Sequence, residues 1–196
     1  MHPLFRAGGI AASVILIVLS VASIAIGMKG RGEVTDNLKQ EGITGTPDMT
    51  PSLTAAAVKE ANLKIDNLPD CSVAGKPIDS GARAKCFAEY MRVHALEGTG
   101  GRVYAEMGRF LTQDGKETDD EKQAGKDPKT GQPLPNGARN VWVTETALGT
   151  ALNTSYFASQ VSMFSIAMGI ALLLTGVGFL VMMLGSMRED SSKPSS

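Results

Sequence analysis

Two long uncharged segments dominate the pattern of hydrophobic and polar positions along this chain. No charged residue occurs from Ala7 to Met28, and none occurs from Thr146 to Met187. A helix needs about 20 mostly apolar residues to cross the hydrocarbon core of a bilayer, and both segments are long enough. The pattern therefore predicts two transmembrane helices, at 7–28 and 157–187, with nearly all charged residues between them.

The first apolar segment also has features of an export signal. Arg6 and the α-amino group precede it, and Ala25 with Gly27 supplies the small residues that a signal-peptide cleavage site requires. Its length is closer to that of an uncleaved signal anchor. We therefore interpret 7–28 as a retained first span preceded by a short tail, 1–6, with a cleaved signal peptide as the alternative.

The second span is expected to continue a helix that begins outside the membrane. Thr144 is a suitable N-cap residue, and Glu145 is favourable at the positive end of a helix dipole. Apolar and small residues then recur at helical spacing, and no proline interrupts them before the span. We predict a stalk helix at 144–156 that is continuous with the span, followed by a polar tail at 188–196.

The polar middle of the chain contains three predicted helices. Thr50 and Pro51 are typical of a helix start and precede a predicted helix at 52–63. A second helix is capped by Asp79 or Ser80 and runs to about Glu97. The third is expected from Thr99 or Gly100 to Leu111, with an i, i+4 pair between Arg102 and Glu106 on its outer side.

These helices are expected to form one small α-helical domain at 50–112. The preceding residues, 29–49, are rich in glycine, threonine and charge and are interpreted as a linker. Residues 113–143 contain many glycines and prolines without a hydrophobic period, which is typical of a mobile polar loop. The predicted fold is thus an all-α membrane protein with two spans flanking a small helical domain.

Both cysteines of the chain, Cys71 and Cys86, lie in this polar middle. Two cysteines do not complete a tetrahedral zinc site, and the only histidine nearby is His94. A disulfide is the simplest interpretation and requires an oxidising compartment; unpaired core cysteines and a redox or metal role are the alternatives. We therefore expect the middle domain outside the plasma membrane and both termini in the cytoplasm.

Charge narrows the classes of function. Lys and Arg total 19 against 20 Asp and Glu, so the chain lacks the basic excess typical of nucleic-acid binders. Neither span carries an ionisable residue, and such residues mark the proton and ion paths of transporters. We therefore expect the chain to contact the lipid bilayer and to bind either a membrane-protein partner or a second copy of itself. We do not expect it to bind nucleic acid.

Small residues within the spans indicate helix packing, because small side chains let helix backbones approach closely where lipid gives no hydrophobic drive. The candidates are Ser23, Gly27, Ser165, Gly169, Gly176 and Gly178.

No pattern of residues points to catalysis. Glu89 and Arg92 have the spacing of an ordinary helix pair, and His94 continues the apolar face formed by Phe87, Tyr90 and Met91. The acidic run at 117–121 lacks the alternating ligands of a calcium loop and is interpreted as a solvated face. We expect neither a cofactor, a metal site nor an enzymatic activity.

The run Asn140-Val-Trp-Val-Thr-Glu-Thr-Ala-Leu-Gly-Thr-Ala-Leu-Asn-Thr-Ser-Tyr156, which leads into Met168-Gly-Ile-Ala-Leu-Leu-Leu-Thr-Gly-Val-Gly-Phe179, resembles a family of uncharacterised bacterial, chiefly actinobacterial, membrane proteins. The region of Cys71 and Cys86 is also similar to that family. The resemblance implies two spans around an extracytoplasmic helical domain. It implies no activity and no site residues.

The sequence favours a structural or accessory integral membrane protein of the bacterial cell envelope, acting through protein–protein interaction or self-assembly. The alternative is a subunit of a homo-oligomeric channel, with hydroxyl residues such as Ser162, Ser165 and Thr175 lining the pore. An enzyme that uses the surroundings of His94 is a third hypothesis.

Overall fold

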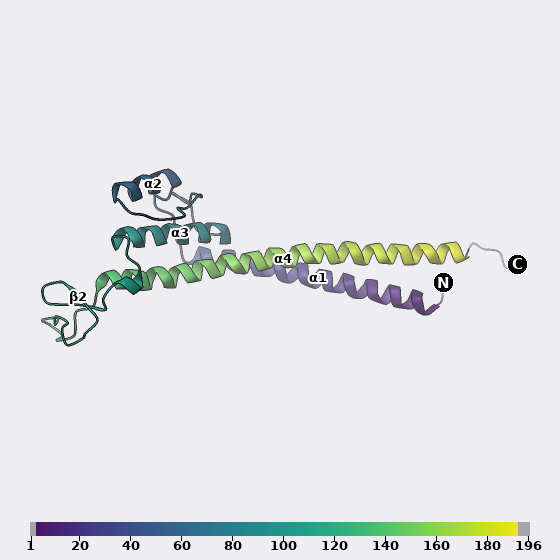
Figure 1. Ribbon diagram of the computed structural model, residues 1–196. Helices are drawn as coiled ribbons and strands as arrows, with labels where there is room; N and C mark the ends of the chain where they lie inside the picture. The colour runs from purple at the N-terminus through teal and green to yellow at the C-terminus, as the bar shows by residue number, and fades with distance from the viewer. Residues whose placement is uncertain (1–2, 192–196) are drawn as a thin grey trace. The chain divides into compact units, whose positions relative to one another are not determined.

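The computed structural model describes residues 3–191, which are mainly α-helical (Figure 1). In chain order the elements are α1 (Pro3–Gln40), α2 (Pro51–Glu60), α3 (Gly81–Gly98), a 3-10 helix η1 (Tyr104–Glu106), β1 (Phe110–Leu111), β2 (Glu117–Thr118) and α4 (Gly137–Ser191). The expected helical fold is therefore present, with a small antiparallel β1–β2 hairpin that the sequence analysis missed. Residues 1–2 and 192–196 of the expected tails lie outside the described residues.

The chain divides into two compact units. The first joins α1 up to Thr35 with α4 from Phe157 onward, and the second is Asp36–Tyr156. Each of α1 and α4 is long and apolar enough to cross a membrane. Only 11% of the most apolar stretch of each helix is buried.

The helix α1 extends well beyond the predicted span at 7–28. Residues 29–40 continue this helix, whereas residues 29–49 were predicted to form a linker. No proline lies in this stretch, and Lys29 forms an i, i+4 ion pair of 3.7 Å with Glu33. Near the end of the helix, Leu38 is buried. Gly42 has a left-handed φ of 63° and donates its N–H to the Lys39 carbonyl at 3.1 Å, a geometry that ends a helix.

The two helices α2 and α3 begin where the capping residues predicted. The Thr50 hydroxyl accepts a hydrogen bond from the Leu53 N–H at 3.4 Å, and Ser80 is the N-cap residue of α3. However, α2 ends at Glu60, before the predicted end at Leu63. The reason is a turn through Asn62, which has a left-handed φ of 53°.

The predicted third helix, from Thr99 or Gly100 to Leu111, is wrong. Gly100 and Gly101 both have left-handed φ angles, of 64° and 81°, which end α3 and prevent a new helix from starting. Only η1 is helical in this stretch, and Phe110 pairs with Thr118 across the β1–β2 hairpin.

The helix α4 begins at Gly137, earlier than the predicted Thr144. The buried Asn136 side chain accepts a hydrogen bond from the Ala138 N–H at 3.1 Å, as an N-cap residue does. The first turns of α4 bring Trp142 into a cluster of buried side chains with Ala95, Leu96 and Met107. In the second unit α3 lies between α2 and the start of α4 (Figure 1).

Candidate functional site

A line of small residues runs along the contact between α1 and α4 in the first unit. Among the described residues of the first unit, six are buried, and all six lie on this line. They are Ser13, Ser20 and Gly27 on α1, and Ser162, Gly169 and Gly176 on α4. Each helix places them at a seven-residue interval, the heptad spacing of helices that pack along a shallow left-handed crossing. We call these six residues the small-residue seam.

The two helices of the seam are antiparallel and in close contact. A Cβ added at Gly27 would lie 2.7 Å from the Ser162 carbonyl oxygen. At Gly169 the distance to the Ser20 oxygen would be 2.9 Å, and at Gly176 a Cβ would lie 3.2 Å from the Ser13 oxygen. Glycine is needed at these three positions because a larger side chain would meet the backbone of the opposing helix.

The serine hydroxyls of the seam bind within their own helices. Ser13 donates to the Gly9 carbonyl at 2.8 Å, Ser20 to Ile17 at 2.7 Å, and Ser162 to Ala158 at 2.9 Å. These buried groups therefore have partners, and the hydroxyls act in the seam as small space-filling groups.

The candidates from the sequence divide between the seam and its surroundings. Gly27, Gly169 and Gly176 lie in it, whereas Ser23 and Ser165 are half-buried beside it. Gly178 is exposed, with nothing within 4 Å of an added Cβ. Ser13, Ser20 and Ser162 are packing residues that were not predicted, and their seven-residue spacing with the glycines is the signal in the sequence that points to them.

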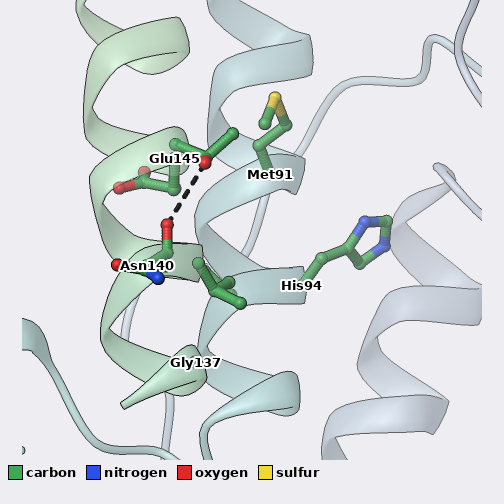
Figure 2. A pocket seen from close by; sticks show the side chains of 8 residues that line it. Met91, His94, Gly137, Asn140 and Glu145 are labelled. Atoms are coloured by element: carbon green, nitrogen blue, oxygen red, sulfur yellow. Dashed lines mark hydrogen bonds between the residues drawn. The ribbon is translucent and has the colours of Figure 1, made fainter. Parts of the chain in front are cut away.

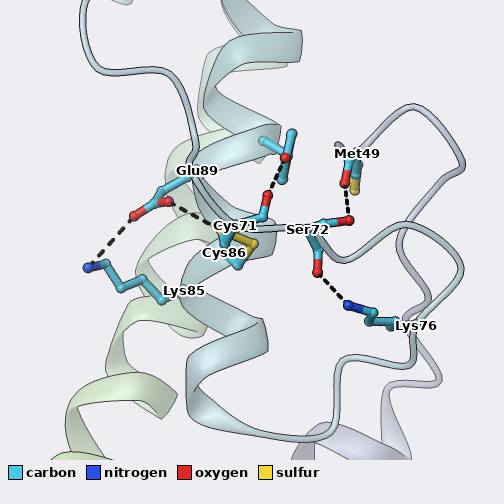
Figure 3. Close-up of a disulfide and its surroundings, with 8 residues drawn as sticks. Met49, Cys71, Ser72, Lys76, Lys85, Cys86 and Glu89 are labelled. Atoms are coloured by element: carbon cyan, nitrogen blue, oxygen red, sulfur yellow. Dashed lines mark hydrogen bonds and ion pairs between the residues drawn. A yellow bond between two sulfur atoms is a disulfide. The ribbon is translucent and has the colours of Figure 1, made fainter. Parts of the chain in front are cut away.

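In the second unit, Cys71 and Cys86 form the expected disulfide, with an S–S distance of 2.08 Å (Figure 3). The bond attaches the segment between α2 and α3 to the first turns of α3. A fully buried Tyr90, one turn further along α3, donates its hydroxyl to the Cys71 carbonyl at 2.5 Å. Burial, followed by the charge of Glu89, raises the pKa of Tyr90, so its hydroxyl stays a donor.

The face of α3 that carries His94 borders a cavity of about 460 Å³ between α3 and the start of α4 (Figure 2). Met91, Ala95 and Val141 supply its apolar wall. The His94 Nε2 lies 3.0 Å from an Asp48 carboxylate oxygen. A hydrogen bond from the Thr46 side chain is the main cause that lowers the pKa of Asp48, and His94 adds to it.

Glu117, which the sequence analysis placed on a solvated face, is the centre of a polar cluster. It receives two hydrogen bonds of 2.9 Å from Arg102, one of 3.1 Å from the Gly108 N–H and one of 3.1 Å from Asn136. The expected pair of Arg102 with Glu106 is therefore wrong. The Arg102 guanidinium, followed by the Gly108 N–H, lowers the pKa of Glu117 from 4.5 to about 2.

This cluster organises residues that were expected to be a mobile loop. Asn136 connects Glu117 to the Gly108 carbonyl, to which it donates at 2.9 Å, and also caps α4. Asp127 closes a tight turn by accepting N–H groups from Lys129 and Thr130, at 2.9 and 2.8 Å. The segment before α4 is thus held by specific hydrogen bonds.

Among the described residues, no group of three or more His, Cys, Asp or Glu side chains is placed to hold a metal ion. Comparison of the chain with models of protein families, with curated proteins and with solved structures finds no match in any of the three.

Proposed function

We propose that the protein is a structural or accessory membrane protein of the bacterial envelope. In this proposal α1 and α4 form a helical hairpin in the bilayer, and the second unit is the part that contacts other proteins. The function is to hold this unit at the membrane surface as a binding module for another membrane component or for a second copy.

The observation that carries the proposal is the apolar surface that the two helices leave uncovered. Their mutual contact is centred on the seam of small side chains with isoleucines such as Ile24 beside it, and many of the other large apolar residues point outward. Leu174 is 69% exposed, Ile26 68% and Phe157 67%. In water, exposing so much apolar surface costs roughly 25 cal/mol per Å², whereas lipid removes this cost.

The disulfide supports an extracytoplasmic second unit. Structural disulfides persist in oxidising compartments and are rare in the cytosol. The bond between Cys71 and Cys86 closes a loop of sequence separation 15 and, with Tyr90, holds a segment that has little regular structure. We therefore propose that both termini are cytoplasmic and that residues 36–156 lie outside.

Cysteine accessibility in intact bacterial cells tests this topology. We expect a membrane-impermeant maleimide to label Cys71 and Cys86 only after reduction, and the protein to stay with the membranes in alkaline carbonate. As a matched control, a Ser195→Cys variant without reduction should be labelled only after lysis. Labelling of Cys71 and Cys86 only after lysis and without reduction would contradict the topology, and release by carbonate would contradict the membrane anchor.

Purification in mild detergent tests the binding function. We expect the full chain to carry a stoichiometric membrane partner or to form a defined oligomer after chemical cross-linking in the membrane. A monomer without a cross-linked neighbour would contradict an accessory role that acts through protein contacts.

A further inference from the structure

Glu145 is a buried acidic residue that the proposed function does not use. It lies on the face of α4 that packs against α3, and only 8% of its surface is exposed. Its neighbours on both helices include small residues, Ala88 on α3 and Gly149 on α4. A glutamate is almost never so deeply buried in a protein unless its charge is compensated.

No Lys, Arg or His among the described residues forms an ion pair with this carboxylate. None of their Lys, Arg or His nitrogens lies within 4.0 Å of it, and it accepts a single hydrogen bond, from the Thr146 hydroxyl at 3.3 Å. An ionised carboxylate has about four acceptor positions. Several of them therefore remain without a donor from the protein.

Glu145 lines the larger cavity and also a second, smaller one. Its Oε1 would be 3.6 Å from a Cβ added at Gly149, which lines that cavity. Figure 2 shows the carboxylate directed away from Met91 and His94, which line the larger one. The smaller cavity measures about 270 Å³, and its polar lining consists of Glu89, Arg92, Glu145, Thr146, Thr150 and Asn153.

Two cations of α3, Lys85 and the cavity-lining Arg92, have other contacts. Lys85 forms an ion pair of 3.7 Å with Glu89 and lies 5.2 Å from the centre of the Tyr156 ring. The Arg92 guanidinium lies 5.3 Å from the centre of the Trp142 ring. Glu89 also approaches Cys71 Sγ at 3.8 Å, but a disulfide sulfur has no hydrogen to donate (Figure 3). Glu145 is left without an ion-pair partner.

We propose that the smaller cavity binds a primary ammonium group on an unbranched alkyl chain, with the ammonium paired to Glu145. The three N–H donors of an ammonium fit one carboxylate together with the hydroxyl and amide oxygens of Thr146, Thr150 and Asn153. A calcium ion would require six or more oxygen ligands. Drug-sized ligands occupy pockets of roughly 300–1,000 Å³, so this cavity suits a ligand of side-chain size.

Two sources of this chemistry are available to an envelope protein: a free alkylamine, and the lysine side chain of a protein. Both present the same ammonium group on the same kind of chain. The inference concerns residues of the second unit only and does not depend on whether α1 and α4 enter a membrane.

Ligand-observed NMR on the full chain in detergent micelles tests the proposal, with 1,5-diaminopentane as the probe. We expect saturable binding of the diamine and none of 1-pentanol, which has the same alkyl chain without the charge. Glu145→Gln should weaken binding about tenfold or more, because a hydrogen bond to a charged group is worth roughly 1.5–3 kcal/mol. Glu60→Gln, at an exposed acid of α2, should leave the affinity unchanged.

A second variant tests the cavity separately from the charge. Gly149→Leu keeps Glu145 but fills the space beside it, and it should also abolish binding while the thermal unfolding of the protein remains cooperative.

Titration with Nα-acetyl-lysine-methylamide alongside the diamine separates the two sources of the ammonium group. Tighter binding of the lysine derivative indicates a protein side chain, and tighter binding of the diamine indicates a free amine. Absence of saturation, equal binding of 1-pentanol, or unchanged affinity in Glu145→Gln would overturn the proposal and leave water as the occupant.

Discussion

Two glycines of α4, Gly169 and Gly178, have opposite surroundings although the same helix carries both. An added Cβ at Gly169 would lie 2.6 Å from Ile24 and 2.9 Å from the Ser20 carbonyl oxygen, whereas at Gly178 it would meet nothing within 4 Å. Composition does not distinguish these positions. The difference arises because one faces α1 and the other faces outward.

Gly169→Leu is therefore expected to destabilise the helix pair, and Gly178→Leu is its matched control. Overpacking of a close contact costs about 1–3 kcal/mol, while both substitutions improve helix propensity equally. The free energy of unfolding, measured by SDS titration in mixed micelles, should fall for Gly169→Leu only. Equal values for the two variants would show that the seam does not hold the helices together.

Tyr90 makes a second residue-scale prediction. Tyr90→Phe removes the hydrogen bond from this fully buried tyrosine and leaves the carbonyl of the half-buried Cys71 without this donor. We expect a loss of about 1–3 kcal/mol in the free energy of unfolding of the second unit. Tyr104→Phe, at a tyrosine that is 44% exposed, should have a much smaller effect in the same chemical denaturation. Similar losses for both would contradict the role of this hydrogen bond.

At the scale of elements, the β1–β2 hairpin and the start of α4 are joined through the carboxylate of Glu117. Hydrogen bonds from the Gly108 N–H, the Arg102 guanidinium and the Asn136 side chain converge on it. A single ionised group thus connects the segment after α3, the hairpin and the N-cap of α4. Protonation of this group weakens all three connections together.

The pH dependence follows from the pKa of Glu117, which is about 2 in the folded protein against an ordinary value of 4.5. A carboxyl whose pKa is lowered by folding stabilises the fold above its unfolded pKa, and this contribution is lost as the pH falls through the folded value. We therefore expect the hairpin to loosen between about pH 4.5 and pH 2. An NMR titration of the Gly108 amide resonance should show a midpoint near 2, and Glu117→Gln should remove this transition. A midpoint near 4.5 would contradict the proposed charge pairing.

At the scale of the whole molecule, the decisive feature is that the apolar faces of α1 and α4 are exposed outside the seam. A core helix of a water-soluble protein of similar hydropathy is mostly buried by other elements, whereas only 11% of the most apolar stretch is buried in each of these helices. In the proposed membrane hairpin, lipid covers this exposed apolar surface.

A pair of arginine substitutions tests whether α1 and α4 form a hairpin in the membrane or a helix pair in water. Leu174→Arg/Val177→Arg adds two charges to the outward face of α4 and should raise the free energy of membrane insertion by roughly 5–7 kcal/mol. We expect this variant to be lost from carbonate-washed membranes. The control, Leu53→Arg/Ala56→Arg on exposed positions of α2, should remain there. Equal membrane retention of both variants would contradict insertion of this segment.

The sequence by itself determined the features that depend on neighbouring residues: the two apolar helices, the starts of α2 and α3, and the choice of Cys71 with Cys86 as the only available pair. These follow from uninterrupted hydropathy, from capping residues and from the cysteine count. The early start of α4 also has a local signal in the sequence, because Asn136 is a suitable N-cap residue directly before Gly137.

Only the tertiary structure decided which residues face one another across the seam, why Glu117 is a structural centre and where Glu145 lies. Each of these depends on a partner far away in the chain: Ser20 for Gly169, Arg102 for Glu117, and α3 for Glu145. Local periodicity also predicted a helix after Thr99 that two left-handed glycines prevent. Local patterns report the environment that a residue prefers, whereas its actual neighbours are set by how the elements pack.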